Sequence, residues 1–180
     1  MKYLNYDIVF EEVPNEVTLA INITNCQHRC EDCHSPELRE DIGEELTNEV
    51  IDRLIEENYG ITCICFMGEG KNIDELKELV TYIREKYLDK YKLAIYSGRK
   101  AVDDWYFETF WVDFSKEHDQ MLVTYFDYIK VGPYKPEFGP LNKETTNQRM
   151  YVHNPFLSTS AVINDKVYKC VMDITNSFWR

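Results

Sequence analysis

The sequence has 180 residues, of which 44% are hydrophobic and 29% charged, proportions that favour a packed globular chain over a disordered one. Its 20 Lys and Arg residues are outnumbered by 32 Asp and Glu residues, so the formal net charge is −12 at pH 7. Because nucleic acids and anionic membranes select basic surfaces, this charge argues against both as partners.

We expect residues 1–180 to form a single domain, because this length is typical of one domain and no repeat or linker-like segment divides the sequence. Residues 1–16 contain no apolar signal core, and no apolar run is long enough to cross a bilayer. We therefore expect a cytoplasmic protein. In a reducing compartment, closely spaced cysteines indicate metal ligation or redox chemistry rather than structural disulfides.

Strands and helices are predicted to alternate along the first half of the chain. Apolar and polar side chains alternate over residues 16–24, as in a half-buried strand. An apolar stripe at helical spacing follows Thr47, a residue type that caps helices, and a glycine at position 60 ends it. The compact apolar run 61–68 predicts a buried strand, and a second helix is predicted over 72–83.

The second half of the chain is predicted to add two more strands, at residues 91–98 and 126–132. The aromatic-rich segment 105–125 between them is ambiguous. Residues 160–174 resemble two short strands that turn at Asn164-Asp165. The order strand, helix, strand, helix, strand predicts parallel βαβ units, and therefore an α/β fold with a mostly parallel sheet.

Polar or glycine-containing segments follow three of the predicted strands. They are the cysteine-containing loop after residue 24, Gly68-Glu69-Gly70 and Ser97-Gly98-Arg99. Because chemistry collects at the C-terminal ends of parallel strands, we expect these segments to share one edge of the sheet.

Three of the six cysteines fall within eight residues, in the stretch TNCQHRCEDCHSPEL (24–38). Free cysteines usually sit singly in cores, so three of them in a polar segment indicate that they hold something. A structural zinc ion would need a fourth ligand, which His28 or His34 could supply, although Cys33 and His34 are adjacent and would have to bend sharply onto one ion. The run CEDCH also matches the attachment sequence of covalent haem, but that attachment normally takes place outside the cytosol.

An iron–sulfur cube is the interpretation that the three cysteines favour. Such clusters are normally held by four thiolates, so three leave one iron coordinatively open. By the reasoning that separates catalytic from structural metal sites, an open iron is a position at which a substrate binds.

The chain resembles the radical S-adenosylmethionine enzymes in its Cys26-x-x-x-Cys30-x-x-Cys33 spacing at the end of a first strand. More narrowly, it is similar to the activating proteins of anaerobic ribonucleoside-triphosphate reductases, a family of glycyl-radical activases. The likeness covers nearly the whole chain. It is carried by CHSPEL (33–38), CFMG (65–68), YSGR (96–99), FDYIKVGPY (126–134), TTNQRMY (145–151) and MDITNSFW (172–179).

The resemblance implies a partial (β/α) barrel of the radical S-adenosylmethionine type with one [4Fe-4S] cluster per chain. It implies that S-adenosylmethionine chelates the open iron and that one electron cleaves its S–C5′ bond. The resulting 5′-deoxyadenosyl radical would take a hydrogen atom from a glycine of the anaerobic ribonucleotide reductase. Reduced flavodoxin or a similar protein is the implied electron donor. The protein supplies binding and orientation, so no acid–base dyad is expected.

The resemblance also implies a role for the residues around the cysteines. It makes Cys26, Cys30 and Cys33 the cluster ligands, and it places Asp32, Cys33 and His34 at S-adenosylmethionine. The sequence departs from the superfamily at Asp32, where an aromatic residue is frequent. For His34, a loop histidine with local hydrogen bonds is an equal alternative.

The remaining implied cofactor contacts lie at the ends of later strands. The superfamily commonly has Gly-Gly-Glu after its second strand, whereas this chain has Gly68-Glu69-Gly70, so Glu69 would have to act from one position earlier. Ser97 and Lys130 are implied to meet the cofactor, Lys130 at its carboxylate. A flexible turn, a turn serine and a surface lysine are the structural alternatives for these positions.

Two other functions stay open for the whole chain. The first is activation of another glycyl-radical enzyme, such as a formate-lyase. The second is a non-catalytic iron–sulfur electron carrier or zinc-binding module. Three ligands instead of four, together with polar residues at successive strand ends, disfavour the second.

Cysteines and histidines elsewhere in the chain are predicted to have no catalytic role. Cys63 and Cys65 alternate within an apolar strand and Cys170 lies in another apolar run, so all three are expected in the core. His118 and His153 are isolated and are expected at the surface.

Overall fold

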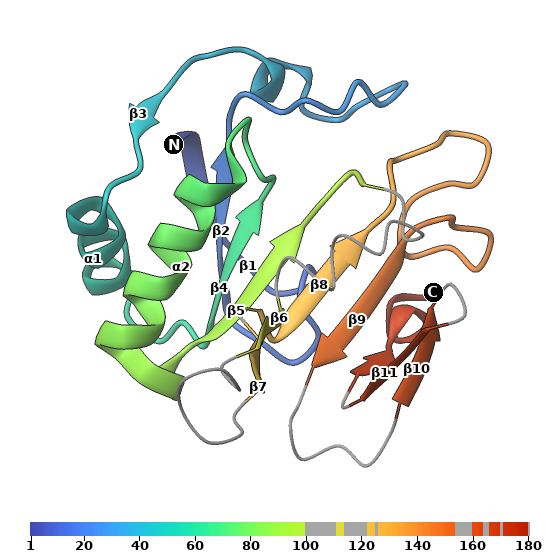
Figure 1. Cartoon of the computed structure of the whole chain (residues 1–180). Coiled ribbons are helices and arrows are strands. Elements are labelled where there is room, and N and C mark those ends of the chain that lie inside the picture. Colours follow the sequence, from blue (N-terminus) through green and yellow to red (C-terminus); the bar gives the residue numbers. More distant parts are fainter. Residues whose placement is uncertain are drawn as a thin grey trace.

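The computed structural model describes residues 1–99, 111–113, 122–124, 126–153, 160–163, 166–169 and 171–179. An eight-stranded mixed sheet forms the centre of this described part (Figure 1). In chain order, its strands are β1 (Lys2–Val9), β2 (Thr18–Ile23), β3 (Glu44–Glu45), β4 (Cys63–Met67), β5 (Lys92–Tyr96), β8 (Tyr128–Val131), β9 (Arg149–His153) and β12 (Val171–Asp173).

The spatial order of the strands is β12-β9-β8-β5-β4-β2-β1-β3. The four central strands β2, β4, β5 and β8 run parallel, which confirms the predicted α/β class. On both sides the outer strands pair antiparallel, so the sheet as a whole is mostly antiparallel and the prediction of a mostly parallel sheet is wrong. Loops without a crossover helix join β1 to β2 and β8 to β9, and such connections allow antiparallel pairing. This strand order does not show a radical S-adenosylmethionine barrel.

Two helices cover one face of the sheet (Figure 1). They are α1 (Asn48–Glu57) and α2 (Ile73–Tyr87), and they confirm the two predicted helices. The Thr47 side chain accepts a hydrogen bond from the Val50 amide at 3.4 Å, and the Asn72 side chain accepts one from Asp74 at 3.1 Å. Both helices therefore begin at side-chain caps that satisfy free amide groups. Three short 3-10 helices are η1 (Pro36–Arg39), η2 (Leu88–Lys90) and η4 (Thr175–Phe178).

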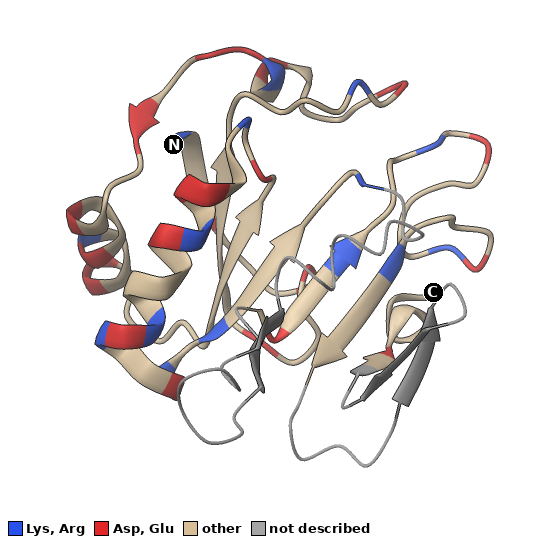
Figure 2. Ribbon diagram, viewed as in Figure 1, with Lys and Arg blue, Asp and Glu red and all other residues tan. Residues whose placement is uncertain are grey.

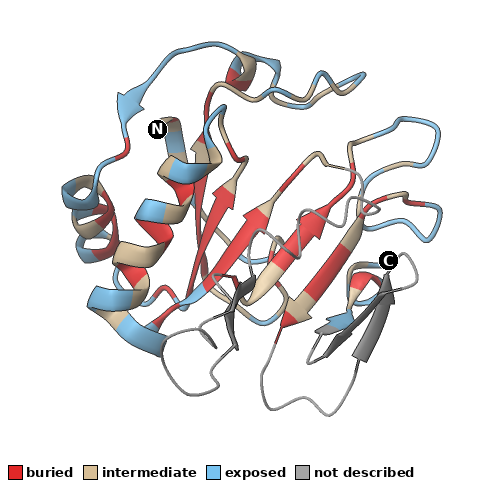
Figure 3. Ribbon diagram, in the orientation of Figure 1, coloured by how far each residue is buried: buried red, intermediate tan, exposed pale blue. Residues whose placement is uncertain are grey.

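The main hydrophobic core lies between the sheet and the helices. Parallel register aligns Ile21, Phe66 and Ile95 across β2, β4 and β5, and all three side chains are fully buried. Figure 3 shows the sheet strands largely buried, while the outer surfaces of the helices are exposed. Phe66 also packs edge-on against Phe126, with ring centroids 6.3 Å apart. The core thus fixes the four parallel strands relative to one another.

The other face of the parallel strands carries small side chains. Ala20, Cys65 and Ala94 are aligned across β2, β4 and β5, and Cys63 is buried two residues earlier on β4. Burial raises the pKa of both thiols well above its usual range, so Cys63 and Cys65 are confirmed as inert core residues. Near the C-terminal ends of the strands this face carries larger and polar side chains, and there Tyr96 aligns with Lys130.

Two short hairpins accompany the main sheet. In the ambiguous segment, β6 (Trp111–Asp113) pairs antiparallel with β7 (Leu122–Thr124). The predicted hairpin near the end is confirmed, because β10 (Ser160–Ile163) pairs antiparallel with β11 (Lys166–Lys169). Its two turn residues, 164 and 165, lie outside the described residues. Within the described chain, no helix is both long and apolar enough to cross a membrane.

The prediction that His153 lies at the surface is wrong. Its side chain is 7% exposed, because it ends β9 between two neighbouring strands. Its backbone amide donates a 2.7 Å hydrogen bond to the Asp127 carbonyl. The predictions for His118 and Cys170 fall outside the described residues.

Phe66→Ala is expected to lower the free energy of unfolding by about 3–5 kcal/mol, because it leaves a cavity where two strands and Phe126 meet. Chemical denaturation of the cluster-free protein measures this change. Tyr59→Ala is the matched control, since Tyr59 is fully exposed, and it should alter the stability by less than about 0.5 kcal/mol. Equal effects of the two substitutions would contradict the position assigned to the core.

Candidate functional site

The three clustered cysteines lie on a long loop that leaves the C-terminal end of β2 (Figure 1). The loop doubles back on itself: the Cys26 amide donates to the Leu38 carbonyl at 2.9 Å, and the Asn25 amide donates to the Glu40 carbonyl at 3.1 Å. The Arg39 guanidinium donates to the Cys30 carbonyl at 2.6 Å. Segment 38–40 therefore holds the backbone of the cysteine loop through hydrogen bonds at residues 25, 26 and 30.

A cavity of about 270 Å³ lies between this loop and the ends of the parallel strands. Every predicted site residue except Asp32 lines it, so the loop, the end of β4, the end of β5 and β8 do share one edge, as the sequence predicts. The Asp32 side chain is exposed, and the residue has a φ of +51°. The His34 ring lines the cavity and packs edge-on against Tyr134, with centroids 5.4 Å apart.

The thiols of Cys26, Cys30 and Cys33 are free and half-buried at the cavity wall. Burial raises the pKa of Cys26, and the neighbouring Cys30 and Cys33 act in the same direction. In the described part of the chain, no three His, Cys, Asp or Glu side chains converge as a site for one metal ion. A [4Fe-4S] cube takes each thiolate on a different iron, so its ligands surround a shared space instead of meeting at one point.

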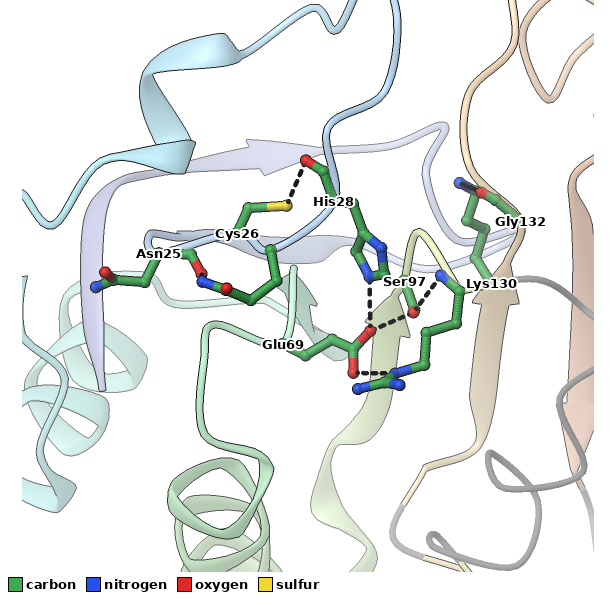
Figure 4. A network of polar contacts seen from close by, with 9 residues as sticks. Asn25, Cys26, His28, Glu69, Ser97, Lys130 and Gly132 are labelled. Carbon is green, nitrogen blue, oxygen red and sulfur yellow. Dashed lines mark hydrogen bonds and ion pairs between the residues drawn. The ribbon is translucent and has the colours of Figure 1, made fainter.

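Glu69 is the centre of a polar network at the edge of the sheet (Figure 4). It is 6% exposed, yet its carboxylate accepts hydrogen bonds from His28 Nε2 at 3.2 Å, Ser97 Oγ at 2.5 Å and Arg99 Nε at 2.9 Å. Burial alone would raise the pKa of Glu69, but these three donors outweigh it and lower the pKa. Glu69 is therefore a fixed negative charge that joins the cysteine loop to the ends of β4 and β5.

Lys130 is the opposite case, a buried cation without a carboxylate partner among the described residues. Its side chain is 7% exposed, and Nζ donates to the Gly132 carbonyl at 3.0 Å and lies 5.7 Å from the centroid of the Tyr96 ring. Burial lowers the pKa of Lys130 to about 8, although the nearby Cys30 opposes this. The surface-lysine alternative is thus wrong, and the cavity has a polar group that favours an anion.

Several residues that line the cavity are not among the predicted site residues, and His28, Tyr134 and Gln148 are three of them. The sequence suggests His28 as a zinc ligand, whereas in the structure it contacts Glu69. Gln148, at 6% exposure, donates to the Gly132 carbonyl at 3.4 Å, and Tyr134 meets His34. Gln148 and Tyr134 lie within motifs that carry the family resemblance, but no local pattern indicates that their side chains turn towards the cysteines.

A comparison with protein-family models matches residues 17–150 to a family described as a 4Fe-4S single cluster domain. The match covers more than half of the chain and includes the whole cysteine loop. The chain belongs to the 4Fe-4S single cluster domain family. No curated protein and no solved structure matches it.

Membership of the 4Fe-4S single cluster domain family confirms the iron–sulfur prediction at the level of a cluster-binding domain. The matched segment contains five cysteines. Two of them, Cys63 and Cys65, are buried in the core with raised pKa values and do not line the cavity. The other three are the candidates for holding the cluster.

The cluster-free protein should become more stable between about pH 8 and 10.5 relative to a Lys130→Met variant. Below pH 8, Lys130 is protonated in both the folded and the unfolded chain, so the folded chain carries the full free-energy cost of burying a charged ammonium group. As the pH rises, the folded chain loses this proton first, while the unfolded chain keeps it up to an ordinary pKa of 10.5, so stability increases. The gain is expected to reach about 3 kcal/mol, measured by chemical denaturation across this pH range. A stability difference that does not change with pH would contradict the unpaired state of Lys130.

Proposed function

We propose that this protein is a radical S-adenosylmethionine activase that generates a glycyl radical on an anaerobic ribonucleoside-triphosphate reductase. The proposal assigns the [4Fe-4S] cluster to Cys26, Cys30 and Cys33 and S-adenosylmethionine to the adjoining cavity. It includes the partial barrel, the reductase as protein substrate and reduced flavodoxin or a similar protein as electron donor. These finer assignments extend the family membership by the resemblance of the sequence motifs.

One observation carries the proposal: three free thiols share a cavity with a buried lysine that has no carboxylate partner in the described part of the chain. Among the described residues, no fourth cysteine lines this cavity. Three thiolates leave one iron of a cube open, and the adjacent polar groups then serve a molecule bound at that iron. An electron carrier needs neither the open iron nor these groups.

The polar groups of the cavity fit the charges of an α-amino acid. Lys130 would hold its carboxylate, because a charge-assisted hydrogen bond there compensates the cost of burying the ammonium group. Glu69 would favour its protonated amine, at the place where the superfamily has Gly-Gly-Glu. The Tyr96 and Tyr134 rings also line the cavity and would shield the bound molecule from water.

Cys26, Cys30 and Cys33 would hold the reduced cluster, which would supply the one electron that splits the S–C5′ bond of S-adenosylmethionine and releases methionine. The adenosyl fragment would then take a hydrogen atom from a glycine of the partner, which would give 5′-deoxyadenosine and a glycyl radical. The residues of this chain bind and orient the reactants, and the chemistry needs no general base. A protein substrate is compatible with the acidic exterior, since Asp and Glu are spread over α1, α2 and the loop before them (Figure 2).

The wild-type protein, reconstituted without air, is expected to bind about four irons per chain. Cys26→Ala, Cys30→Ala and Cys33→Ala should each lose most of this iron, whereas Cys63→Ala, which changes a core cysteine, should keep it. Iron analysis and the electron paramagnetic resonance (EPR) spectrum of the reduced cluster measure these outcomes. Equimolar zinc instead of iron would reject the proposal.

S-adenosylmethionine should change the EPR spectrum of the reduced cluster, and methionine and 5′-deoxyadenosine should form. An unchanged spectrum without cleavage would reject the activase function and favour an electron carrier. Mixing the enzyme with an anaerobic ribonucleotide reductase or with a formate-lyase separates the two activase functions. A glycyl radical is expected on the reductase alone.

Lys130→Met is expected to weaken the binding of S-adenosylmethionine about 10- to 100-fold, the loss typical of one hydrogen bond to a charged group. Titration of the spectral change of the reduced cluster gives the affinity. Lys135→Met is the control, since Lys135 is exposed and does not line the cavity. Equal affinities of the two variants would show that Lys130 does not contact the carboxylate.

A further inference from the structure

His28 lies midway in the sequence between Cys26 and Cys30, and its side chain points towards the Glu69 carboxylate (Figure 4). Its Nε2 atom is 3.2 Å from Glu69 Oε1. Among the described side chains of residues 26–35, it alone forms a hydrogen bond to an end of the parallel strands. Through His28, the cysteine loop is therefore attached to the edge of the sheet.

The His28 imidazole packs closely against the backbone of Gly98. A Cβ atom added at Gly98 would lie 2.6 Å from Cγ and 2.7 Å from Cδ2 of His28, closer than such contacts occur in proteins. The ring therefore packs against bare backbone just after β5. Contacts with Glu69 and Gly98 fix the ring from two strand ends at once.

We propose that His28 is a positioning residue that holds the cysteine loop and the Glu69 carboxylate in the arrangement needed to bind S-adenosylmethionine. This inference rests on the proposed function. Glu69 Oε1 is shared by His28 and Ser97, and Oε2 is held by Arg99, so the carboxylate has a fixed orientation. Without His28, the buried Oε1 loses a donor and the loop loses its link to the sheet.

This role differs from that of a cluster ligand. A ligand contributes electrons to iron directly, so its loss removes iron or changes the spectrum of the cluster before any cofactor is added. Loss of a positioning residue leaves the three thiolates in place, so it lowers mainly the affinity for the cofactor. Removing groups that orient ligands without touching the metal typically costs 10- to 100-fold in affinity or activity.

The test compares His28→Ala, His28→Gln and Gln27→Ala in the reconstituted enzyme. Glutamine keeps an N–H donor near the position of Nε2, and Gln27 is an exposed neighbour whose side chain donates to the Asn25 carbonyl. All three variants should keep about four irons per chain and the wild-type EPR spectrum without cofactor. His28→Ala should need about 10- to 100-fold more S-adenosylmethionine for half of the spectral change, His28→Gln should recover most of this loss, and Gln27→Ala should match the wild type.

Gly98→Ala tests the same role in a different way, because it keeps the imidazole but pushes it away from its position against Gly98. It should weaken S-adenosylmethionine binding as His28→Ala does. In a Glu69→Gln background, removal of His28 should add little further loss, because His28 acts through that carboxylate. The melting temperature of each cluster-free variant shows whether the chain is folded.

Several outcomes would overturn the inference while the proposed function stands. One is a His28→Ala variant that binds S-adenosylmethionine as tightly as the wild type, and another is a His28→Gln variant that recovers none of the lost affinity. A third is a loss of iron or an altered cofactor-free spectrum in His28→Ala, which would make His28 a cluster ligand. If His28→Ala does not fold, wild-type binding by Gly98→Ala overturns it. A wild-type enzyme that itself gives no spectral response to S-adenosylmethionine would reject the proposed function instead.

Discussion

The site depends on one buried carboxylate. An isolated charge inside a protein is costly, and Glu69 persists there because three side chains from two other segments donate to it. Two of these donors follow the end of β5 and one belongs to the cysteine loop, so the contacts that stabilise the charge also hold the loop against the ends of β4 and β5. The cavity lies beside these contacts and is lined by the three thiols and by residues from the strand ends.

Lys130 gives the cavity its second electrostatic feature. Whereas Glu69 accepts from three donors, Lys130 contacts a backbone carbonyl and the Tyr96 ring but no carboxylate among the described residues, and burial lowers its pKa to about 8. A fold that keeps such a lysine loses stability unless a bound anion compensates it. One satisfied carboxylate and one unsatisfied ammonium, beside three thiols, are the features on which we base the binding of an amino-acid-like cofactor at a cluster.

Much of the parallel part of the fold could be predicted because its signals are local. Thr47 and Asn72 cap the two helices with their own side chains, and the apolar periods of the strands follow from facing the helices. The outer strands could not be predicted in the same way. β1 and β9 pair antiparallel with β2 and β8 across irregular loops, and which strand pairs with which depends on the assembled sheet rather than on a pattern within one stretch.

The spacing of the three cysteines indicates an iron–sulfur domain without any structure, and the order of the predicted strands indicates which segments meet at their ends. These are short-range properties, since spacing along a chain limits which atoms can share one cluster. That His28 faces Glu69, that Lys130 is buried and that Asp32 is exposed became known from the folded chain. Side-chain direction and burial depend on segments brought together from far along the chain, and no pattern within one segment records them.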